Sequence, residues 1–315
     1  MIATLQSLRF IFMMMIFMSH YAYRDIRAFD AGGDCGVAFF FLLSGFVCSL
    51  GYGRQVQEGT FNYGNFILRR IRKIYPLHLL CLFFYLLMSH SSFDMKALLN
   101  LLLLQSWVPD AEWYFSCNAV SWFLSSLLFC YLLFPWTYRY VSKSLSLLIL
   151  LAYIFTYWLT PNGHINAILY VSPLVRFVDF YWGMLLHRLY ERNIALPGSG
   201  RAEVLLLIAL VFTLAVYPYT DSKFRNAPLY WLVLIPLIWV FAQQKGIISR
   251  WLKSKPMMFL GSLTMPIFLT HQLLIGILLH RLPEMPSMLM LFICIFVVLV
   301  ISWGIQIIFY RLLRL

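Results

Sequence analysis

Long runs of uncharged, apolar residues follow one another along this chain of 315 residues. Each run approaches the roughly 20 residues that a helix needs to cross about 30 Å of hydrocarbon. The runs do not alternate between polar and apolar residues, as the strands of a membrane barrel do. Hydrophobic residues make up 62% of the chain and charged residues 11%, against about half and about a quarter in a soluble domain. The sequence therefore predicts an all-α, polytopic transmembrane helical bundle, with residues 1–315 forming a single membrane-embedded domain.

The apolar runs predict about ten membrane spans. An additional apolar stretch, 98–107, is too short to cross a bilayer, so we expect it to form an interfacial or re-entrant helix. The predicted spans cover residues 5–22, 36–52, 74–90, 119–137, 143–160, 168–187, 203–218, 228–243, 257–280 and 287–310.

The net charge of +12 arises mainly from Lys and Arg in the short loops between these runs. If the N-terminus is cytoplasmic, sixteen of these cations fall in cytoplasmic loops and six in outer loops, including Arg24 and Arg27. This asymmetry is typical of the positive-inside rule and places both termini in the cytoplasm. The cations do not gather on a soluble face, so the expected partner is the lipid bilayer and not nucleic acid. Arg9 interrupts the first apolar run and no small-residue cleavage site follows it, which predicts a retained first helix.

The six cysteines show no CxxC or other metal-ligand spacing, so the sequence predicts no metal site. Cys35 and Cys117 are the two that we expect in outer loops. If those loops face an oxidising compartment, the two thiols could form a disulfide. Two unrelated thiols is an equally good interpretation, and both remain open.

Arg9 and His20 are ionisable residues within the first predicted span. Such groups are costly in a membrane and usually face a polar cavity or pathway. Their spacing of eleven positions places both on one helix face, roughly 16 Å apart along the axis. A cation at one end and an imidazole that accepts a proton near neutral pH at the other suit a substrate threaded through the bilayer. The alternative is that Arg9 extends to the interface and His20 is structural.

Three further ionisable residues fall within later spans. Arg176 and Asp179 are three positions apart, so they can neutralise each other on one helix, and a structural pair is favoured over contact with a substrate. His271 follows Pro266, which is expected to kink its helix and expose a backbone carbonyl. Two interpretations of His271 remain open: it lines a cavity, or it bonds that carbonyl.

A basic cluster of Arg69, Arg70, Arg72 and Lys73 precedes the third predicted span. One interpretation is a patch that sets the topology and binds lipid headgroups. The other is a dock for a phosphate-rich cytosolic ligand, because Arg side chains match phosphate oxygens. Arg69 and Arg72 share a face if the helix begins before Tyr75. Charge alone favours the lipid interpretation.

Short motifs follow one another in a fixed order along most of the chain. They are Arg9 and His20 in LRFIFMMMIFMSH, GVAFFFLLSGF from Gly36 to Phe46, Arg69 and Arg72 in FILRRIRKIYP, WFLSSLLFCYLLFP from Trp122 to Pro135, and LGSLTMPIFLTHQ with His271. Together they resemble the acyltransferase family 3 of membrane O-acyltransferases. Two positions depart from that family: Leu127 stands where it commonly has Glu, and Ala38 where it often has Asp.

The resemblance implies transfer of an acyl group, usually acetyl, from cytosolic acyl-CoA to a hydroxyl of a cell-surface glycan or its lipid-linked precursor. It implies a multi-pass protein of the cell (inner) membrane, with acetyl-CoA or another acyl-CoA as donor. His20 would activate the acceptor hydroxyl or briefly carry the acyl group. Arg9 would anchor the donor inside the bundle, and Arg69 and Arg72 would hold its adenosine-phosphate end. The candidates for cavity walls are Ser44, Trp122, Arg176, Asp179 and His271.

Two other functions are compatible with the same residues. A secondary transporter or exporter of a small polar solute also places ionisable groups in the membrane; unlike an acyltransferase, it needs no acyl-CoA. A non-catalytic membrane subunit is the third possibility, but a scaffold has little reason to keep Arg9 and His20 on one face.

Overall fold

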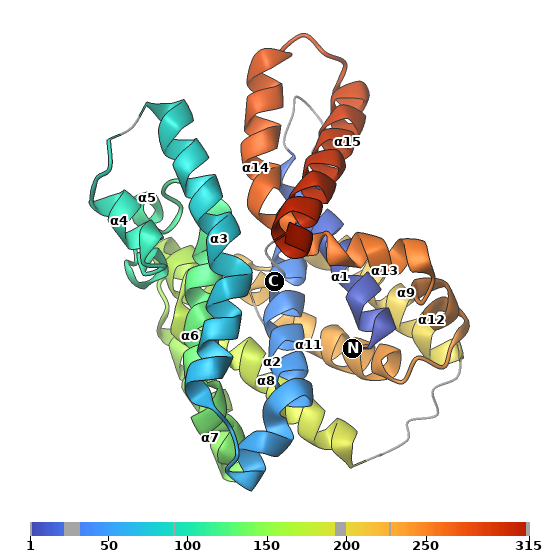
Figure 1. Ribbon diagram of the computed structural model, residues 1–315. Helices are drawn as coiled ribbons and strands as arrows, with labels where there is room; N and C mark the ends of the chain where they lie inside the picture. The colour runs from blue at the N-terminus through green and yellow to red at the C-terminus, as the bar shows by residue number, and fades with distance from the viewer. Residues whose placement is uncertain (1, 22–31, 91, 193–199, 227, 313–315) are drawn as a thin grey trace.

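Helices account for every regular element in the part of the chain that the computed structural model describes, residues 2–21, 32–90, 92–192, 200–226 and 228–312. Figure 1 shows them as one bundle, with α14 and α15 rising together as a hairpin beside α3. The α-helices are α1 (Ala3–His20), α2 (Gly33–Glu58), α3 (Tyr63–Ser89), α4 (Met95–Leu101), α5 (Ala111–Tyr114), α6 (Trp122–Arg139), α7 (Lys143–Leu159), α8 (Pro173–Glu191), α9 (Gly200–Val216), α10 (Ser222–Arg225), α11 (Pro228–Ala242), α12 (Ile247–Leu252), α13 (Lys255–Ser262), α14 (Thr264–Arg281) and α15 (Ser287–Ile305).

Each predicted span overlaps a helix or, at 257–280, the pair α13 and α14. The all-α, polytopic bundle is therefore confirmed. Six described helices are long and apolar enough to cross a membrane, and the bent pair would make a seventh. Helices α1, α7 and α8 are shorter or more polar than these, so the count of ten spans and the cytoplasmic termini stay predictions. Arg24 and Arg27, which entered the charge argument, lie outside the described residues.

The stretch predicted as an interfacial or re-entrant helix is broken into short pieces. Helix α4 ends at Leu101, and a single 3₁₀ turn, η1 (Gln105–Trp107), follows it. Buried polar contacts hold this segment to the bundle: Nε2 of His78 in α3 lies 2.9 Å from the carbonyl oxygen of Asn100. The stretch is thus too short and too irregular to cross a bilayer, as expected.

All six cysteines lie in the described part of the chain and all have free thiols. Cys35 lies inside α2, where it is fully buried, and not in an outer loop. The prediction that placed it in a loop is wrong because α2 begins at Gly33, three residues before the predicted span. Cys117 lies in the segment between α5 and α6. The possible disulfide between Cys35 and Cys117 is not formed.

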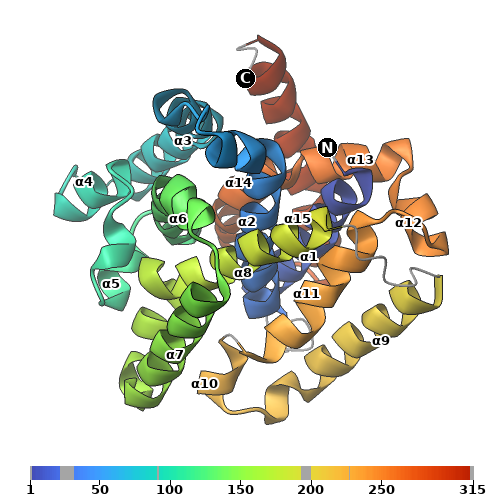
Figure 2. The same cartoon turned by 90° about the horizontal axis from the view of Figure 1, so that it is seen from below.

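Helices α2 and α8 pack in the middle of the bundle, with α7 and α9 at its rim (Figure 2). Their backbones touch at two glycines. A Cβ atom added at Gly45 would overlap the carbonyl oxygen of Phe180, and one added at Gly183 would overlap that of Leu42. Small residues allow this approach in membranes, where helix association depends on close packing. Gly261 of α13 meets the backbone of α1 in the same way, at the carbonyl oxygen of Gln6.

The chain bends by 58° between α13 and α14. Pro266 lies in the first turn of α14, so the break falls just before it at Leu263. Helix α3 begins eleven residues before its predicted span. The prediction started too late because the first turns of this helix carry the basic cluster and are not apolar. The bend and the long α3 place α13, α14 and the basic cluster around the same space.

Candidate functional site

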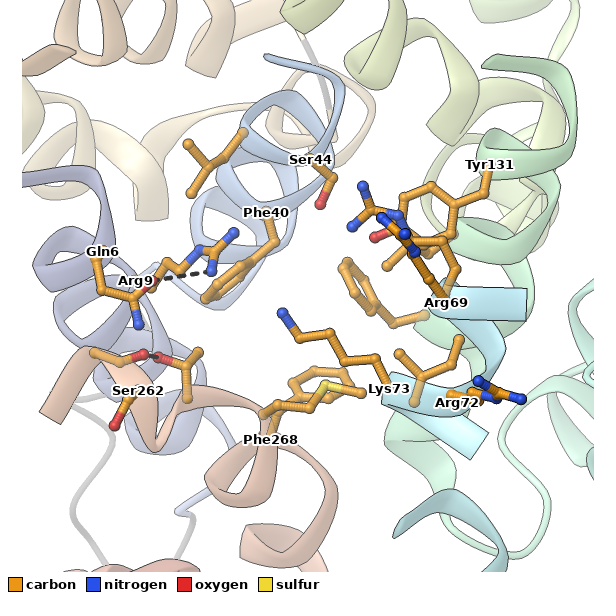
Figure 3. Close-up of a pocket in the computed structure, with 18 of the residues that line it drawn as sticks. Gln6, Arg9, Phe40, Ser44, Arg69, Arg72, Lys73, Tyr131, Ser262 and Phe268 are labelled. Atoms are coloured by element: carbon orange, nitrogen blue, oxygen red, sulfur yellow. Dashed lines mark hydrogen bonds between the residues drawn. The ribbon is translucent and has the colours of Figure 1, made fainter. Parts of the chain in front are cut away.

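A cavity of about 710 Å³ lies between the basic start of α3 and the helices α1, α2, α6, α13 and α14. Figure 3 shows its lining residues, with α1 on one side and α3 on the other. Ser44 of α2 lines it as predicted, and so does Leu127 of α6, the position at which a Glu is absent. The lining residues are Gln6, Arg9, Phe40, Leu43, Ser44, Arg69, Arg70, Arg72, Lys73, Ile74, Phe123, Leu127, Tyr131, Gly261, Ser262, Thr264, Met265, Phe268 and Gln306.

Five cationic side chains line this cavity: Arg9, Arg69, Arg70, Arg72 and Lys73. None of its described lining residues is acidic. Arg9 and Lys73 reach into the open space from opposite walls, whereas Arg72 points away from it (Figure 3). Like charges gathered in a partly dry space repel one another strongly. The electrostatics of the cavity therefore favour a ligand that carries several negative charges.

Three aromatic rings surround the guanidinium group of Arg70 in the cavity wall. Its guanidinium carbon lies 5.0 Å from the ring centroids of both Phe66 and Tyr131 and 5.5 Å from that of Tyr52. Aromatic faces attract a cation through their quadrupole and fix its position without neutralising its charge. Sequence reasoning singled out Arg69 and Arg72 from their spacing. It missed Arg70 because Tyr52 and Tyr131 are distant in the sequence.

A histidine pair joins α1 to α14. Nδ1 of His20 lies 2.9 Å from Nε2 of the fully buried His271. Nδ1 of His271 lies 2.8 Å from the carbonyl oxygen of Phe268 and 3.1 Å from that of Ile267. Carbonyl oxygens only accept, so Nδ1 of His271 carries a hydrogen and, in the neutral ring, its Nε2 accepts. His20 then donates from Nδ1, and Nε2 is the basic nitrogen of its neutral ring.

His271 does not bond the carbonyl that Pro266 frees. That carbonyl belongs to Ser262, four residues before the proline, whereas His271 contacts the carbonyls of Ile267 and Phe268 within its own helix. His271 does not line the large cavity either. His271 thus contacts two backbone carbonyls of its own helix and the ring of His20, and its functional role stays a prediction.

The cavity and the histidine pair lie at successive positions of the same two helices. Phe268 of α14 lines the cavity, and its ring centroid lies 6.2 Å from that of His271, one turn further along. On α1, Arg9 lines the cavity and His20 lies in the last turn. Eleven residues of helix separate Arg9 from His20, or roughly 16 Å. The cavity and the histidine pair are thus neighbours along α1 and α14, with the ring of Phe268 between them.

Arg176 and Asp179 lie in α8 away from the cavity lining and almost fully buried. Nη1 of Arg176 lies 2.9 Å from Oδ2 of Asp179, and the indole of Trp231 donates to Oδ1 at 2.6 Å. Nη2 of Arg176 donates to the carbonyl oxygens of Leu169 and Asn226. The charges of Arg176 and Asp179 are therefore paired with each other and with these partners. Neither residue lines the cavity, so the prediction that they form part of its wall finds no support.

Trp122, another predicted cavity residue, does not line the cavity. Its ring centroid lies 4.9 Å from that of Tyr170, and the side chain is buried. Its neighbour Phe123 occupies the cavity wall instead, with its ring centroid 5.1 Å from that of Phe268. The sequence therefore indicated the correct helix, α6, but the side chain that faces the cavity is Phe123 and not its neighbour Trp122.

Comparison with known proteins gives one family and two relatives. The family described as Acyltransferase domain matches residues 2–307. "Acyltransferase MdmB" of Streptomyces mycarofaciens is 34% identical over 123 residues, which cover 35% of this chain and 30% of the relative. "Protein 2 in picA locus" of Rhizobium radiobacter is 46% identical over 52 residues, 16% of this chain and 27% of the relative. The chain thus aligns with less than a third of either relative's length. No solved structure matches it.

Proposed function

This chain belongs to the acyltransferase family that matches residues 2–307, and on that basis we propose that it moves an acyl group from cytosolic acyl-CoA to a hydroxyl. The expected donor is acetyl-CoA. The expected acceptor is a hydroxyl of a cell-surface glycan or its lipid-linked precursor, and the expected location is the cell (inner) membrane. The observation that carries the proposal is the cationic cavity without a described acidic lining residue, with its Arg9 on the same helix as His20 and its Phe268 one turn from His271.

The cavity would hold the phosphate-bearing end of the donor. Acyl-CoA carries several phosphate charges at one end and a thioester at the other, with a long neutral arm between them. Arg9, Arg70 and Lys73 would bind the phosphates inside, and Arg69 would hold them nearer the mouth. Arg72, which points away from the cavity, would add only a longer-range attraction. Charge-assisted hydrogen bonds from Arg to phosphate are strong and geometrically specific. The neutral arm would then lead the thioester past Phe268 towards His20.

His20 would act as the general base. Its Nε2 would take the proton of the acceptor hydroxyl while the hydroxyl oxygen attacks the thioester carbonyl. The carbon–sulfur bond breaks, CoA leaves as a thiolate, and the protonated His20 returns the proton to that sulfur. A positioned base of this kind contributes about 10² to 10⁴ in rate. Leu127 lines the cavity where the family commonly has Glu, so the imidazole is the proton acceptor that this proposal requires.

The test is a titration of acetyl-CoA into the detergent-purified protein, with release of free CoA as the second readout. We expect saturable binding that Arg9→Ala weakens. We expect His20→Ala to keep binding and to abolish release. Folded wild-type protein that binds no acyl-CoA would overturn the proposal and favour a transporter, whose flux needs no acyl donor.

A further inference from the structure

Asn118 lies immediately before the 3₁₀ turn η2 (Ala119–Ser121), which continues into α6. An asparagine at this position commonly caps the helix that follows, because its side-chain oxygen accepts from one of the first backbone N–H groups. The side chain of Asn118 makes no such bond to the described residues of η2. It is buried, and its Nδ2 donates to the carbonyl oxygen of Leu269 in α14 at 2.9 Å. Only the nitrogen of an amide can donate to a carbonyl, so the orientation of this side chain is fixed.

The backbone on both sides of Asn118 is held in place. The preceding residue, Cys117, has a left-handed conformation with a φ of 57°, which is uncommon for a residue other than glycine. On the other side, Oγ of Ser121 donates to Oδ1 of Asn100 at 2.9 Å and accepts from Nε2 of Gln105 at 3.0 Å. These bonds join the start of α6 to α4 and η1. The side chain that reaches α14 therefore starts from a fixed position.

Leu269 lies two residues before His271, in the turn of α14 that carries the histidine contact. Side chains of α14 itself bond the carbonyls of the three residues before Leu269, through Thr270 and His271. The bond to Leu269 is different, because Asn118 brings it from another element. Within the described part of the chain, this turn of α14 thus has one side-chain hydrogen bond to its surroundings that fixes its position along the helix axis.

A directional bond is needed here because the other supports of α14 are weak guides to its position. The helix follows a 58° bend, so α13 does not hold it in line. The rings of Phe123 and Phe268 pack between α6 and α14, but apolar contacts are not directional. Nδ1 of His20 and Nε2 of His271 are 2.9 Å apart, and a shift of about 1 Å would take them out of the usual hydrogen-bond range of about 2.7–3.2 Å.

We propose that Asn118 is a positioning residue for the acyl transfer. Its bond to Leu269 fixes α14 against the start of α6, and so holds His271 where it orients His20. This inference rests on the proposed function, in which His20 is the general base. Asn118 acts through α14 and takes no part in proton transfer.

The test measures CoA release at saturating acetyl-CoA, per folded molecule of the full-length protein in detergent, together with the Kd for acetyl-CoA. Asn118→Leu keeps the size of the side chain and removes the donor. A misplacement of about 1 Å can cost about 10²-fold in rate, so we expect release to fall at least tenfold while the Kd stays within twofold. Ser106→Ala is the matched control, because the buried Ser106 also donates to a backbone carbonyl, that of Trp122, but its bond does not involve α14. It should release CoA at the wild-type rate.

Asn118→Asp adds a readout that general damage to the fold would not give. An ionised carboxylate cannot donate to the carbonyl of Leu269, whereas a protonated carboxyl group can. The rate of this variant, relative to wild type at the same pH, should therefore rise as the pH is lowered and the carboxyl group becomes protonated. If burial keeps the group protonated throughout, the relative rate should exceed that of Asn118→Leu at every pH. Either form of rescue supports the inference, also if Asn118→Leu fails to fold.

Three results would overturn the inference and leave the proposed function intact. They are release by Asn118→Leu at the wild-type rate, an equal loss in Ser106→Ala, and the absence of any rescue in Asn118→Asp. If folded wild-type protein binds no acetyl-CoA, the inference and the proposed function are both wrong.

Discussion

His20 and His271 stand 251 positions apart in the chain, and 2.9 Å separates Nδ1 of the first from Nε2 of the second. The contact joins the last turn of α1 to α14. Because two backbone carbonyls fix the hydrogen of His271 on Nδ1, the pair also fixes which nitrogen of His20 carries its hydrogen.

Replacing His271 tests this relationship. His271→Ala removes the acceptor for His20 Nδ1, so the imidazole loses its preferred tautomer and orientation. We expect CoA release to fall by about 10² or more, within the range attributed to a positioned base, while the Kd for acetyl-CoA stays within twofold. Release at the wild-type rate would show that His20 needs no partner. Ile275→Ala, which removes a buried side chain one turn further along α14 and outside the cavity lining, is the control for general damage to this helix.

Arg70 and Arg72 should contribute unequally to donor binding. Arg70 is held among three aromatic rings within the cavity wall, whereas Arg72 is exposed and points away from the cavity. We expect Arg70→Ala to raise the Kd for acetyl-CoA at least tenfold, or about 1.4 kcal/mol. We expect Arg72→Ala to raise it less than about threefold, as for solvent-exposed ion pairs. If Arg70→Ala and Arg72→Ala raised the Kd equally, the three aromatic rings around Arg70 would have no special part in donor binding.

Gly45 should tolerate no side chain. Gly45→Ala would drive a methyl group into the carbonyl oxygen of Phe180 and push α8 away from α2. Overpacking of this kind costs about 1–3 kcal/mol, and backbone cannot yield as a side chain does. Thermal unfolding in detergent should show a lower midpoint for this variant. Gly51→Ala on the same helix is the control, since its added Cβ meets nothing within 4 Å; equal midpoints for the two variants would contradict the packing.

Labelling of Cys117 can show on which side of the membrane the segment between α5 and α6 lies. Burial, and then the nearby charge of Asp94, raise the pKa of its thiol to about 11. The thiolate is the reactive form, so alkylation should be slow at pH 7 and accelerate about tenfold per pH unit up to pH 9. With cytoplasmic termini, a membrane-impermeant maleimide should label intact cells at Cys117, and Cys117→Ser should abolish the signal. Labelling only after lysis would reverse the predicted topology.

The helices could be predicted from the sequence because crossing hydrocarbon demands apolar runs of a fixed length. The predicted helix boundaries were less accurate for the parts of helices that extend beyond the hydrocarbon layer. Helix α3 extends eleven residues before its predicted span, since a helix outside the bilayer tolerates the charges of Arg69 and Arg70.

The site was predictable only where it depends on local spacing. Arg9, Ser44, Arg69 and Arg72 line the cavity, and their roles in binding and catalysis stay predictions. The contact of His20 with His271 depends on packing between distant helices, and no local pattern encodes it. Gln306 of the cavity wall was missed for a related reason: a glutamine near the end of an apolar run looks interfacial, and only the packing of the turn after α15 places it beside the cavity.

The cationic cavity also affects how this protein behaves in the laboratory. Five like charges are brought together when the chain folds, and any small polyanion in solution relieves their repulsion. Phosphate and sulfate in a purification buffer would compete with the substrate and raise thermal stability without being part of the reaction. Assays in such buffers would underestimate affinity, and stabilisation by a candidate nucleotide counts as recognition only when it exceeds that given by equal concentrations of inorganic anions.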